Sequence, residues 1–404
     1  IPNIRFKGFT DPWEQRKFGD VGSVAMCKRI FKEQTSDEGD VPFYKIGTFG
    51  GEPDAYISQE LFDEYKAKYP FPNKGDILIS ASGSIGRTVE FTGENEYFQD
   101  SNIVWLKHGK DIDNSFLKIL YNVVEWSCEG STIKRLYNDN FLKTEFMLPN
   151  IDEQKKIGEY FCSLDNLITL HQRKYNKLLN VKKSMLEKMF PKNGSNIPEI
   201  RFKGFTDPWE QRKLLSCIEK ITDFRGRTPK KLGMDWSESG YLALSALNVK
   251  DGYIDFSQDV HYGDQALYDK WMSGNELHKG QVLFTTEAPM GNVAQVPDNK
   301  RYILSQRTIA FDVKEDIITE NFLATLLRSP AVFNTLTSLS SGGTAKGVSQ
   351  KSLAGVDIQI PVKLREQELL ATYFSNLDNL ITLHQRELEK LQNIKKSMLE
   401  KMFV

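Results

Sequence analysis

Two long stretches of the chain carry apolar or semi-apolar residues at alternating spacings of three and four. The first lies within 152–190 and the second within 365–403. Their positions are Phe161, Leu164, Ile168, His171, Tyr175 and Leu178, then Phe374, Leu377, Ile381, His384, Leu388 and Leu391. Methionines continue both series, with Lys182 and Lys395 in the one polar gap. This alternation over several heptads is typical of a coiled-coil seam, and each helix is expected to be roughly 55–60 Å long.

The simplest arrangement packs these two seams on each other. If a pseudo-twofold axis relates the two halves of the chain, the helices are antiparallel and one variable region projects from each end. In the alternative arrangement each helix packs only on its own domain. The seam histidines His171 and His384 fit partly buried side chains better than metal ligands, because no further metal-ligand spacing accompanies them.

Between the helices the hydrophobic pattern changes to short apolar runs that indicate strands. Each region has a strand introduced by Lys-Gly, a small-residue loop, a second strand, a helix, a polar loop and a strand ending before proline. The first region places the two strands, the helix and the proline at 76–80, 102–106, 115–124 and 149, and the second region places them at 281–285, 308–311, 321–329 and 361. The two regions therefore share one α/β (α+β) plan with little common sequence.

The outer parts of this plan occur twice almost unchanged. Residues 1–17 read IPNIRFKGFTDPWEQRK and return at 197–213 with only Asn3 replaced by Glu199. The block 163–190 returns at 376–403 with 22 of 28 residues identical. Such an internal repeat usually marks one structural unit per copy. Four segments are expected: a first variable domain with its conserved N-terminal segment (1–150), a conserved helix and linker (151–196), a second variable domain with the repeated segment (197–362), and a second conserved helix (363–404).

Both copies of the N-terminal block contain Asp-Pro-Trp-Glu, at 11–14 and 207–210. Asp suits a helix cap, Pro suits the first helical position, and Glu three residues later completes a capping box. The motif therefore predicts a helix start. Trp13 and Trp209 are expected to pack near the ends of the long helices.

Charge and cysteine content limit the functional classes. The net charge is −1, and the variable stretches 18–145 and 214–357 hold 14 basic against 21 acidic and 15 basic against 17 acidic residues. A chain that binds nucleic acid unaided usually has a strong basic excess, so any such role needs local basic patches and a partner. Four scattered cysteines, no apolar run of roughly 18 residues and no signal-peptide pattern favour a cytoplasmic protein.

No catalytic motif stands out. The nearest approach to a phosphate loop, 341–349, has its lysine misplaced, and no glycine fingerprint for a dinucleotide or S-adenosylmethionine follows a strand. Nuclease carboxylates, metal-ligand clusters and Ser/His/Asp or Cys/His sets are also not indicated. Catalysis by this chain alone is therefore not predicted.

Local clusters of cations, hydroxyls and glycines do suit DNA. Arginine reads guanine bidentately, while lysine and hydroxyl groups hold phosphates, although a charged run is also consistent with a solvated face. The DNA-binding candidates are Lys28, Arg29, Ser82, Ser84, Arg87, Lys134 and Arg135 in the first region, and Arg225, Arg227, Thr228, Lys230, Lys231, Arg307, Thr344 and Lys346 in the second.

The blocks RFKGFTDPWEQRK and NLDNLITLHQR…KKSMLEKMF, with a variable domain before each long helix, resemble the specificity subunit of a Type I restriction-modification system over essentially the whole chain. The resemblance implies that each variable domain is a target recognition domain for one half of a split DNA sequence. It implies that the helices form an antiparallel coiled coil that sets the spacer and docks two methyltransferase subunits. Those partners bind S-adenosylmethionine and methylate adenine, and a motor subunit that uses ATP and Mg²⁺ translocates and cuts DNA.

The expected function is therefore non-catalytic recognition of an asymmetric, bipartite double-stranded DNA target, since two different readers imply two different half-sites. No cofactor is expected on this chain itself. Two alternatives remain open from the residues: a scaffold with two protein-recognition modules on a coiled-coil spacer, and a nuclease or methyltransferase with divergent motifs.

Overall fold

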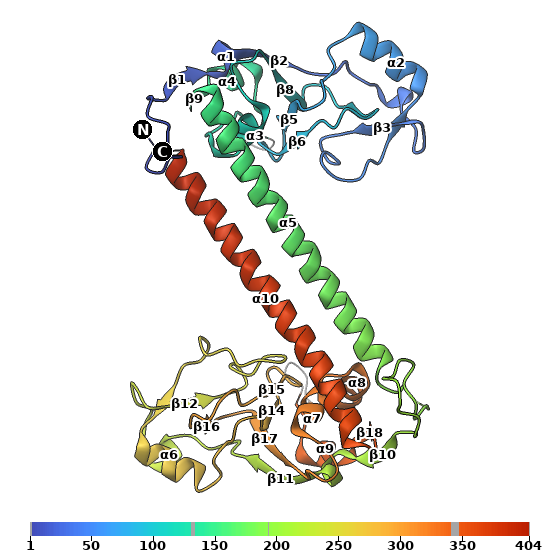
Figure 1. Ribbon diagram of the computed structural model, residues 1–404, viewed down its shortest axis with the longest axis vertical. Coiled ribbons are helices and arrows are strands. Elements are labelled where there is room, and N and C mark those ends of the chain that lie inside the picture. The colour runs from blue at the N-terminus through green and yellow to red at the C-terminus, as the bar shows by residue number, and fades with distance from the viewer. Residues whose placement is uncertain (1, 131–133, 193, 341–346, 404) are drawn as a thin grey trace. The chain divides into compact units, whose positions relative to one another are not determined.

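The chain folds into two units, and each long helix contributes to both. Unit 1 comprises residues 1–172 and 386–404, and unit 2 comprises residues 173–385. The structure is a computed structural model that describes residues 2–130, 134–192, 194–340 and 347–403 (Figure 1). The N-terminal part of α5 (Ile151–Lys188) and the C-terminal part of α10 (Leu364–Met402) belong to unit 1, and their other parts belong to unit 2.

Unit 1 is built on an antiparallel four-stranded sheet in the order β2-β8-β5-β6, formed by Gly22–Ala25, Ile103–His108, Ile77–Ser80 and Thr88–Glu90. Successive residues of β5 point to opposite faces, so Ile77 and Ile79 join one core and Leu78 joins another. Helix α3 (Asn114–Val123) covers the first face. A small sheet, β4-β3-β7 (Tyr56–Ile57, Val41–Tyr44, Tyr97–Phe98), and α2 (Gln59–Lys68) contribute to the second core.

Unit 2 repeats this plan. Its larger sheet has the order β11-β17-β14-β15, formed by Ile218–Asp223, Thr308–Val313, Val282–Thr285 and Val293–Gln295, and α7 (Glu320–Leu327) packs on it. The smaller sheet is β13-β12-β16 (Tyr262–Gly263, Tyr241–Leu244, Ile303–Leu304), next to α6 (Gln265–Met272). The short helices are α1 (Phe18–Val21), η1 (Lys32–Gln34), α4 (Asn138–Lys143), η2 (Leu214–Cys217), η3 (Lys230–Leu232) and α9 (Gln350–Gly355). The common α/β plan predicted from the sequence is confirmed.

One helix lies where the sequence predicted only a polar loop. Helix α8 (Pro330–Leu339) follows α7 in unit 2, whereas the described part of 124–137 in unit 1 contains no helix. Pro330 occupies the first turn, where its missing N–H is not needed. Val332 and Leu336, one turn apart, are buried in the unit 2 core. This amphipathic spacing was hidden by the surrounding Ser, Thr and Asn residues.

The Asp-Pro-Trp-Glu motif does not begin a helix, so that prediction was wrong. Glu14–Lys17 form β1, which pairs antiparallel with β9 (Glu145–Leu148), and Glu210–Lys213 form β10, which pairs with β18 (Asp357–Ile360). The indole Nε1–H of Trp13 donates to Glu153 at 3.2 Å, and that of Trp209 donates to Glu366 at 3.3 Å. These bonds hold each tryptophan at the start of a long helix. The backbone N–H and C=O groups of the residues that follow it pair with a neighbouring strand and do not form a helical turn. The predicted packing of both tryptophans near helix ends is confirmed.

A buried ion pair attaches each copy of the N-terminal block to a long helix. The guanidinium of Arg5 donates twice to Glu153 (2.7 and 2.7 Å), and that of Arg201 donates twice to Glu366 (2.7 and 2.8 Å). Backbone hydrogen bonds also attach each block to the C-terminal end of the other long helix. The N–H of Ile4 donates to Lys401 at 3.2 Å, and that of Ile200 donates to Lys188 at 2.9 Å.

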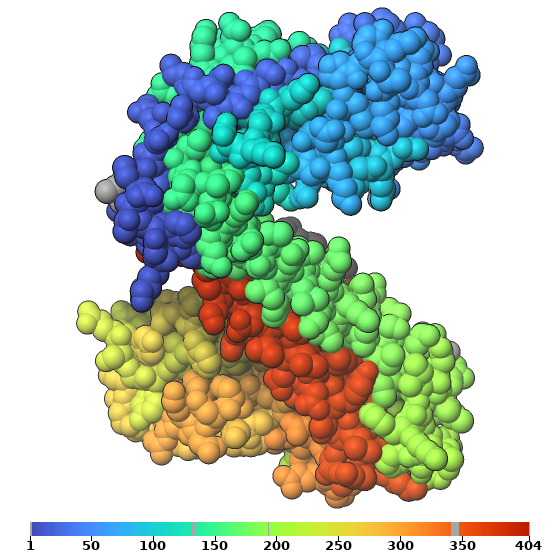
Figure 2. All heavy atoms as spheres, turned by 45° about the horizontal axis from the view of Figure 1, so that its top comes forward, coloured from blue at the N-terminus to red at the C-terminus, as the bar shows by residue number. Residues whose placement is uncertain are grey.

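The two long helices lie side by side and pack on each other within each unit (Figure 2). In unit 1 the rings of Phe161 and Phe403 are 6.5 Å apart, while Asp165 pairs with Lys395 further along. Residue numbers therefore rise along α5 as they fall along α10. Unit 2 has the same antiparallel order, from Lys182 with Asp378 to Phe190 with Phe374. Of the expected seam, Phe161, Leu164, Phe374, Leu377, Ile381 and Leu388 are buried, and Ile168, His171, Tyr175, Leu178, His384 and Leu391 are half-buried.

Candidate nucleic-acid interface

In unit 1 the loop after β5 lies against a segment from much later in the chain. The N–H of Leu136 donates to the C=O of Ala81 at 2.8 Å, and that of Gly83 donates to Lys134 at 3.2 Å. The N–H of Ala81 donates to Asn102 at 2.7 Å, which brings in the turn before β8. Three segments therefore meet at one end of the larger sheet.

Unit 2 brings the corresponding segments together after β14. The N–H of Val348 donates to Thr286 at 2.9 Å, and that of Thr286 donates to Arg307 at 2.8 Å. Glu287 forms a β-bridge with Gly347, as Ser82 does with Arg135 in unit 1. The same arrangement of backbone hydrogen bonds among three segments therefore recurs at the same end of the larger sheet. This arrangement is called the frame below.

The loops themselves also fold alike, but their side chains differ. Gly86 and Gly291 both have positive φ, where a residue with a Cβ is strained, and each bonds back to the last residue of its strand. At equivalent positions of this frame lie Ser82 and Glu287, Arg87 and Asn292, Asn102 and Arg307, and Arg135 and Gly347. One frame thus presents two different sets of donors and acceptors.

Four of the seven predicted residues in unit 1 come together at this meeting point: Ser82, Ser84, Lys134 and Arg135. Ser82 is buried, while both cations are exposed, and neither cationic side chain bonds to a described residue. Arg135 also lines a groove of about 650 Å³ with Ser101, Tyr137 and Asn138. Unpaired cations beside a groove suit phosphate or base contacts.

The other three predicted residues of unit 1 are each engaged with a neighbouring group of the chain. Arg29 bonds to Asp100 at 3.0 Å, close to the turn before β8, and the ammonium of Lys28 lies 5.1 Å from the ring of Tyr69. Arg87 donates to the C=O of Ile46 at 2.6 Å, with its guanidinium 5.5 Å from the ring of Phe49. Arg87 therefore supports the loop after β3 instead of joining the meeting point.

In unit 2 the predicted Arg225 is already paired. Its guanidinium donates to both carboxylate oxygens of Asp223, with the shortest contact at 2.6 Å, and to the C=O of Val348 at 3.3 Å. Burial acts to raise the pKa of Asp223, but the hydrogen bonds from Arg225 outweigh it and keep this pKa below its usual range. Gln350 donates to the same carboxylate at 2.9 Å. Arg225, Asp223 and Gln350 thus form one connected polar surface beside the 347–348 segment.

The remaining predicted residues near η3 divide into two groups. Arg227 is structural in character, since it donates to the C=O of Trp271 and its guanidinium lies 4.1 Å from the ring of Phe224. Lys231 donates to the C=O of Gly226 at 2.7 Å. Thr228 and Lys230 instead line a separate cavity of about 310 Å³, together with Trp236, Asp259, His261 and Gln306.

Arg307 is the last described DNA-binding candidate of unit 2, and its Nε lies 3.3 Å from the carboxylate of Glu287. The predicted residues Thr344 and Lys346 lie outside the described residues. The sequence criteria of cations and hydroxyl groups did not select Glu287, Asp223 or Gln350, although acidic and amide groups also read bases. Aligning the loops after the two apolar strands would have placed Glu287 opposite Ser82.

Other kinds of site are not supported by the described residues. They contain no group of three or more His, Cys, Asp or Glu side chains arranged to hold a metal ion. Burial raises the pKa of the Cys27 thiol to about 12, so this cysteine is a poor nucleophile at neutral pH. Within the described ranges, no helix has the length and apolar character needed to cross a membrane.

Comparison with known families matches most of the chain to one model. Residues 10–180 and 206–393 both match the Type I restriction modification DNA specificity domain. The two matched stretches each contain one variable region and most of the helix that follows it. The repeat recognised from the sequence therefore corresponds to two copies of this domain.

Individual relatives agree with the family model. The chain is 58% identical over 158 residues to the Haemophilus influenzae type I restriction enzyme specificity subunit S.HindORF215P, and the match covers 38% of the chain and 41% of that relative. It is 26% identical over 341 residues to the MjaVIII specificity subunit of Methanocaldococcus jannaschii, which covers 81% of the chain and 75% of that relative. The crystal structure of the Type I S subunit from M. genitalium has the same fold, with a TM-score of 0.60 at 15% identity over 100% of this chain and 99% of that one.

Proposed function

Because the chain belongs to the Type I restriction modification DNA specificity family, we propose that its two units each read one half of a bipartite DNA target. The observation that carries this proposal is the repeated frame after β5 and β14, which holds different side chains at equivalent positions. Different donors and acceptors on one frame select different bases. The target is therefore asymmetric, and the chain itself performs no catalysis.

The charge distribution supports base reading by this chain and phosphate binding largely by partner subunits. Neither variable stretch has a basic excess, yet Lys134 and Arg135 in unit 1 are exposed and unpaired among the described residues. Phosphate contacts give most of the affinity for DNA, and base contacts give the discrimination. We infer that partner subunits supply much of the phosphate binding. In this proposal the methyltransferase partner binds S-adenosylmethionine, and a motor partner uses ATP and Mg²⁺.

Docking of two methyltransferase subunits is supported by exposed leucines on the long helices. Leu167 and Leu170 of α5 are 45% and 46% exposed, and their repeat equivalents Leu380 and Leu383 of α10 are 44% and 52% exposed. Large apolar side chains that face solvent in pairs mark a surface for a protein partner. The repeat retains both pairs, so we propose one methyltransferase subunit on each.

Mapping of methylated adenines tests the reading function. Genomic DNA from a host that expresses this chain with its cognate methyltransferase should carry methylation at one split motif with two unlike halves. Exchanging Glu287 for Ser, the residue of unit 1, should change the preferred bases in one half only. A continuous motif, or a change in both halves, would contradict the proposal.

Light scattering on purified complexes tests the docking. The wild-type chain should bind two methyltransferase subunits, L167D/L170D should bind one, and adding L380D/L383D should leave none. Leu179 provides a matched control, because it is 39% exposed on α5 but corresponds to Gln392 in the second repeat. L179D should still bind two copies. Loss of binding in this control would mean that any charge on the helix disrupts the complex.

A further inference from the structure

An exposed ion pair lies on the frame of unit 2. The Nε of Arg307 is 3.3 Å from a carboxylate oxygen of Glu287, and the two side chains are 52% and 46% exposed. In the described part of unit 2, neither side chain hydrogen-bonds to a third residue. A guanidinium has several N–H donors and a carboxylate has several acceptor sites, so most of this hydrogen-bonding capacity is open to a ligand.

The frame fixes the backbone from which both side chains project. The C=O of Arg307 accepts from the backbone N–H of Thr286 at 2.8 Å and from the hydroxyl of the same threonine at 3.2 Å. Glu287 is the next residue and forms the β-bridge with Gly347. The φ of Arg307 is +62°, in the left-handed region that residues with a Cβ rarely adopt. Such backbone strain persists where surrounding contacts impose it, and it is concentrated at functional sites.

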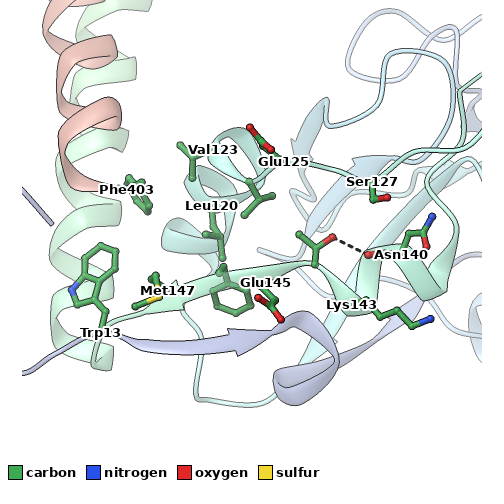
Figure 3. A pocket seen from close by; sticks show the side chains of 13 residues that line it. Trp13, Leu120, Val123, Glu125, Ser127, Asn140, Lys143, Glu145, Met147 and Phe403 are labelled. Carbon is green, nitrogen blue, oxygen red and sulfur yellow. Dashed lines mark hydrogen bonds between the residues drawn. The ribbon is translucent and has the colours of Figure 1, made fainter. Parts of the chain in front are cut away.

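Unit 1 differs at this place. Ser82 and Asn102 occupy the equivalent positions of its frame, and neither side chain is charged. Its glutamates Glu125 and Glu145 instead line a groove beside the β1–β9 ribbon, as Figure 3 shows. Among the described residues, a carboxylate paired with a guanidinium at these two positions is therefore a feature of unit 2.

A C·G base pair presents the matching pattern in the major groove of DNA. The N4 amino group of cytosine is a donor, and the O6 and N7 atoms of guanine are acceptors. A carboxylate accepts from cytosine N4, and a guanidinium donates to both guanine acceptors. In a T·A pair the two groups at the centre are reversed, because thymine O4 accepts and adenine N6 donates. Adjacent Glu and Arg side chains therefore match C·G, but they meet T·A with acceptor against acceptor and donor against donor.

We propose that Glu287 and Arg307 together read one C·G pair in the half-site of unit 2, with Glu287 on cytosine and Arg307 on guanine. This inference rests on the proposed reading function and names one base pair that unit 2 selects. An exposed ion pair contributes little to stability, so both side chains can turn from each other to a base pair at low cost. Arg225 is less suited to this role, because its guanidinium already donates to both oxygens of Asp223.

Maps of methylated adenine give the first test, made in hosts that express this chain with its cognate methyltransferase. The wild-type map should contain a specified C·G pair in one half of the split motif. R307A and E287A should each make that same position degenerate and leave the other half unchanged. E276A is the matched control, because Glu276 forms a similarly exposed ion pair with Arg301 elsewhere in unit 2. Its map should equal that of the wild type.

Competition between two duplexes measures the size of the effect. The purified complex is titrated with duplexes that carry the mapped site and differ only by C·G or T·A at this position. The wild type should prefer C·G by about 5- to 150-fold, and R307A and E287A should each lower this ratio at least about threefold. E287S/R307N carries the residues of unit 1 and should also lower the ratio. This variant covers a folding failure of R307A, because asparagine tolerates positive φ.

Three results would overturn the proposal: a position changed in R307A that is not a C·G pair, maps of R307A and E287A that equal the wild-type map, or equal loss of affinity for both duplexes. The last result would assign the two residues to phosphate contacts or their support. Each of the three leaves a split motif in the wild-type map. Absence of any split motif would overturn the proposed reading function as well, so the two failures are distinguishable.

Discussion

The ammonium group of Lys395 lies 2.6 Å from the carboxylate of Asp165 in unit 1. The repeat places Lys182 2.7 Å from Asp378 in unit 2, where Asp378 also accepts from Arg328 at 2.8 Å. The side chains of Lys182 and Arg328 are 15% and 11% exposed, against 34% for Lys395. The same sequence pair is thus a surface contact in one unit and part of a buried network in the other.

Asn substitution at the two aspartates should therefore have unequal effects. D378N leaves Lys182 and Arg328, both poorly solvated, beside a neutral amide, with Asp251 as the carboxylate that still pairs with them, and should lower the free energy of unfolding of unit 2 by about 2 kcal/mol. D165N removes a more exposed pair and should cost no more than about 1 kcal/mol in unit 1. Native-state hydrogen exchange measures the two units separately. Equal costs would show that burial does not control the strength of these pairs.

The D378N effect should depend on pH. Burial acts to raise the pKa of Asp378, but the hydrogen bond and charge of Arg328, with Lys182, outweigh it and lower this pKa. A lowered pKa in the folded state contributes stability above the unfolded value of about 3.8, and this contribution is lost as the pH falls through the folded value. The stability difference between wild type and D378N should be constant near neutrality and shrink below about pH 4. Thermal unfolding of both proteins across this range is the measurement, and a stability difference that stays constant from pH 5 to pH 2 would contradict the assignment.

The buried anchors of the N-terminal blocks should be strongly coupled to folding. Glu153 is fully buried and accepts from both Arg5 and Trp13, so R5A leaves an uncompensated carboxylate and should cost about 3–5 kcal/mol. R201A should have a similar cost in unit 2, because Glu366 is equally buried. R16A, which removes only the exposed pair with Glu14, serves as the control and should change stability by less than about 0.5 kcal/mol. Denaturant unfolding compares the three variants.

Two arginines that the sequence grouped together as DNA contacts should separate by experiment. R135A should weaken DNA binding by about 1–3 kcal/mol if Arg135 contacts a base, or lower the salt slope by about one if it contacts phosphate, with no loss of stability. R227A removes the bond to Trp271 and the contact with Phe224, so it should lower the unfolding temperature. Affinity at several salt concentrations, paired with thermal unfolding, tests both. Loss of stability in R135A would assign a structural role to Arg135. Weakened DNA binding by a stable R227A would make Arg227 a DNA contact.

The sequence predicted regular elements well where one residue pattern decides the outcome. The three-four alternation located both long helices, and buried runs such as 77–80 and 282–285 located the central strands. Prediction from the sequence failed where a contact with a residue remote in sequence determines the local structure. Asp11-Pro12-Trp13 reads as a helix start, yet the bond from Trp13 to Glu153, 140 residues away, places a strand there. The polar gaps Lys182 and Lys395 gave no hint of their aspartate partners.

For the candidate interface, the sequence found the right loops but not the state of each side chain. Arg225 and Arg135 look alike as exposed-loop arginines, and only the structure shows Asp223 neutralising the first. Helix α8 escaped notice because its two buried residues are separated by Ser, Thr and Asn. Which of two similar side chains is free to meet a ligand depends on neighbours that are remote in sequence.

The bonds from Ile4 to Lys401 and from Ile200 to Lys188 have a consequence for how the gene can be arranged. In unit 2 the helix end and the following block are joined by the linker 191–196, and in unit 1 the same two pieces meet without a peptide connection in the described chain. The two junctions are interchangeable in space. A cyclic permutant that is opened within the linker and closed by a copy of residues 191–199 between Phe403 and Ile4 would keep the contacts described between the blocks and the helix ends in both units. The order in which the two readers are translated is therefore not fixed by the fold.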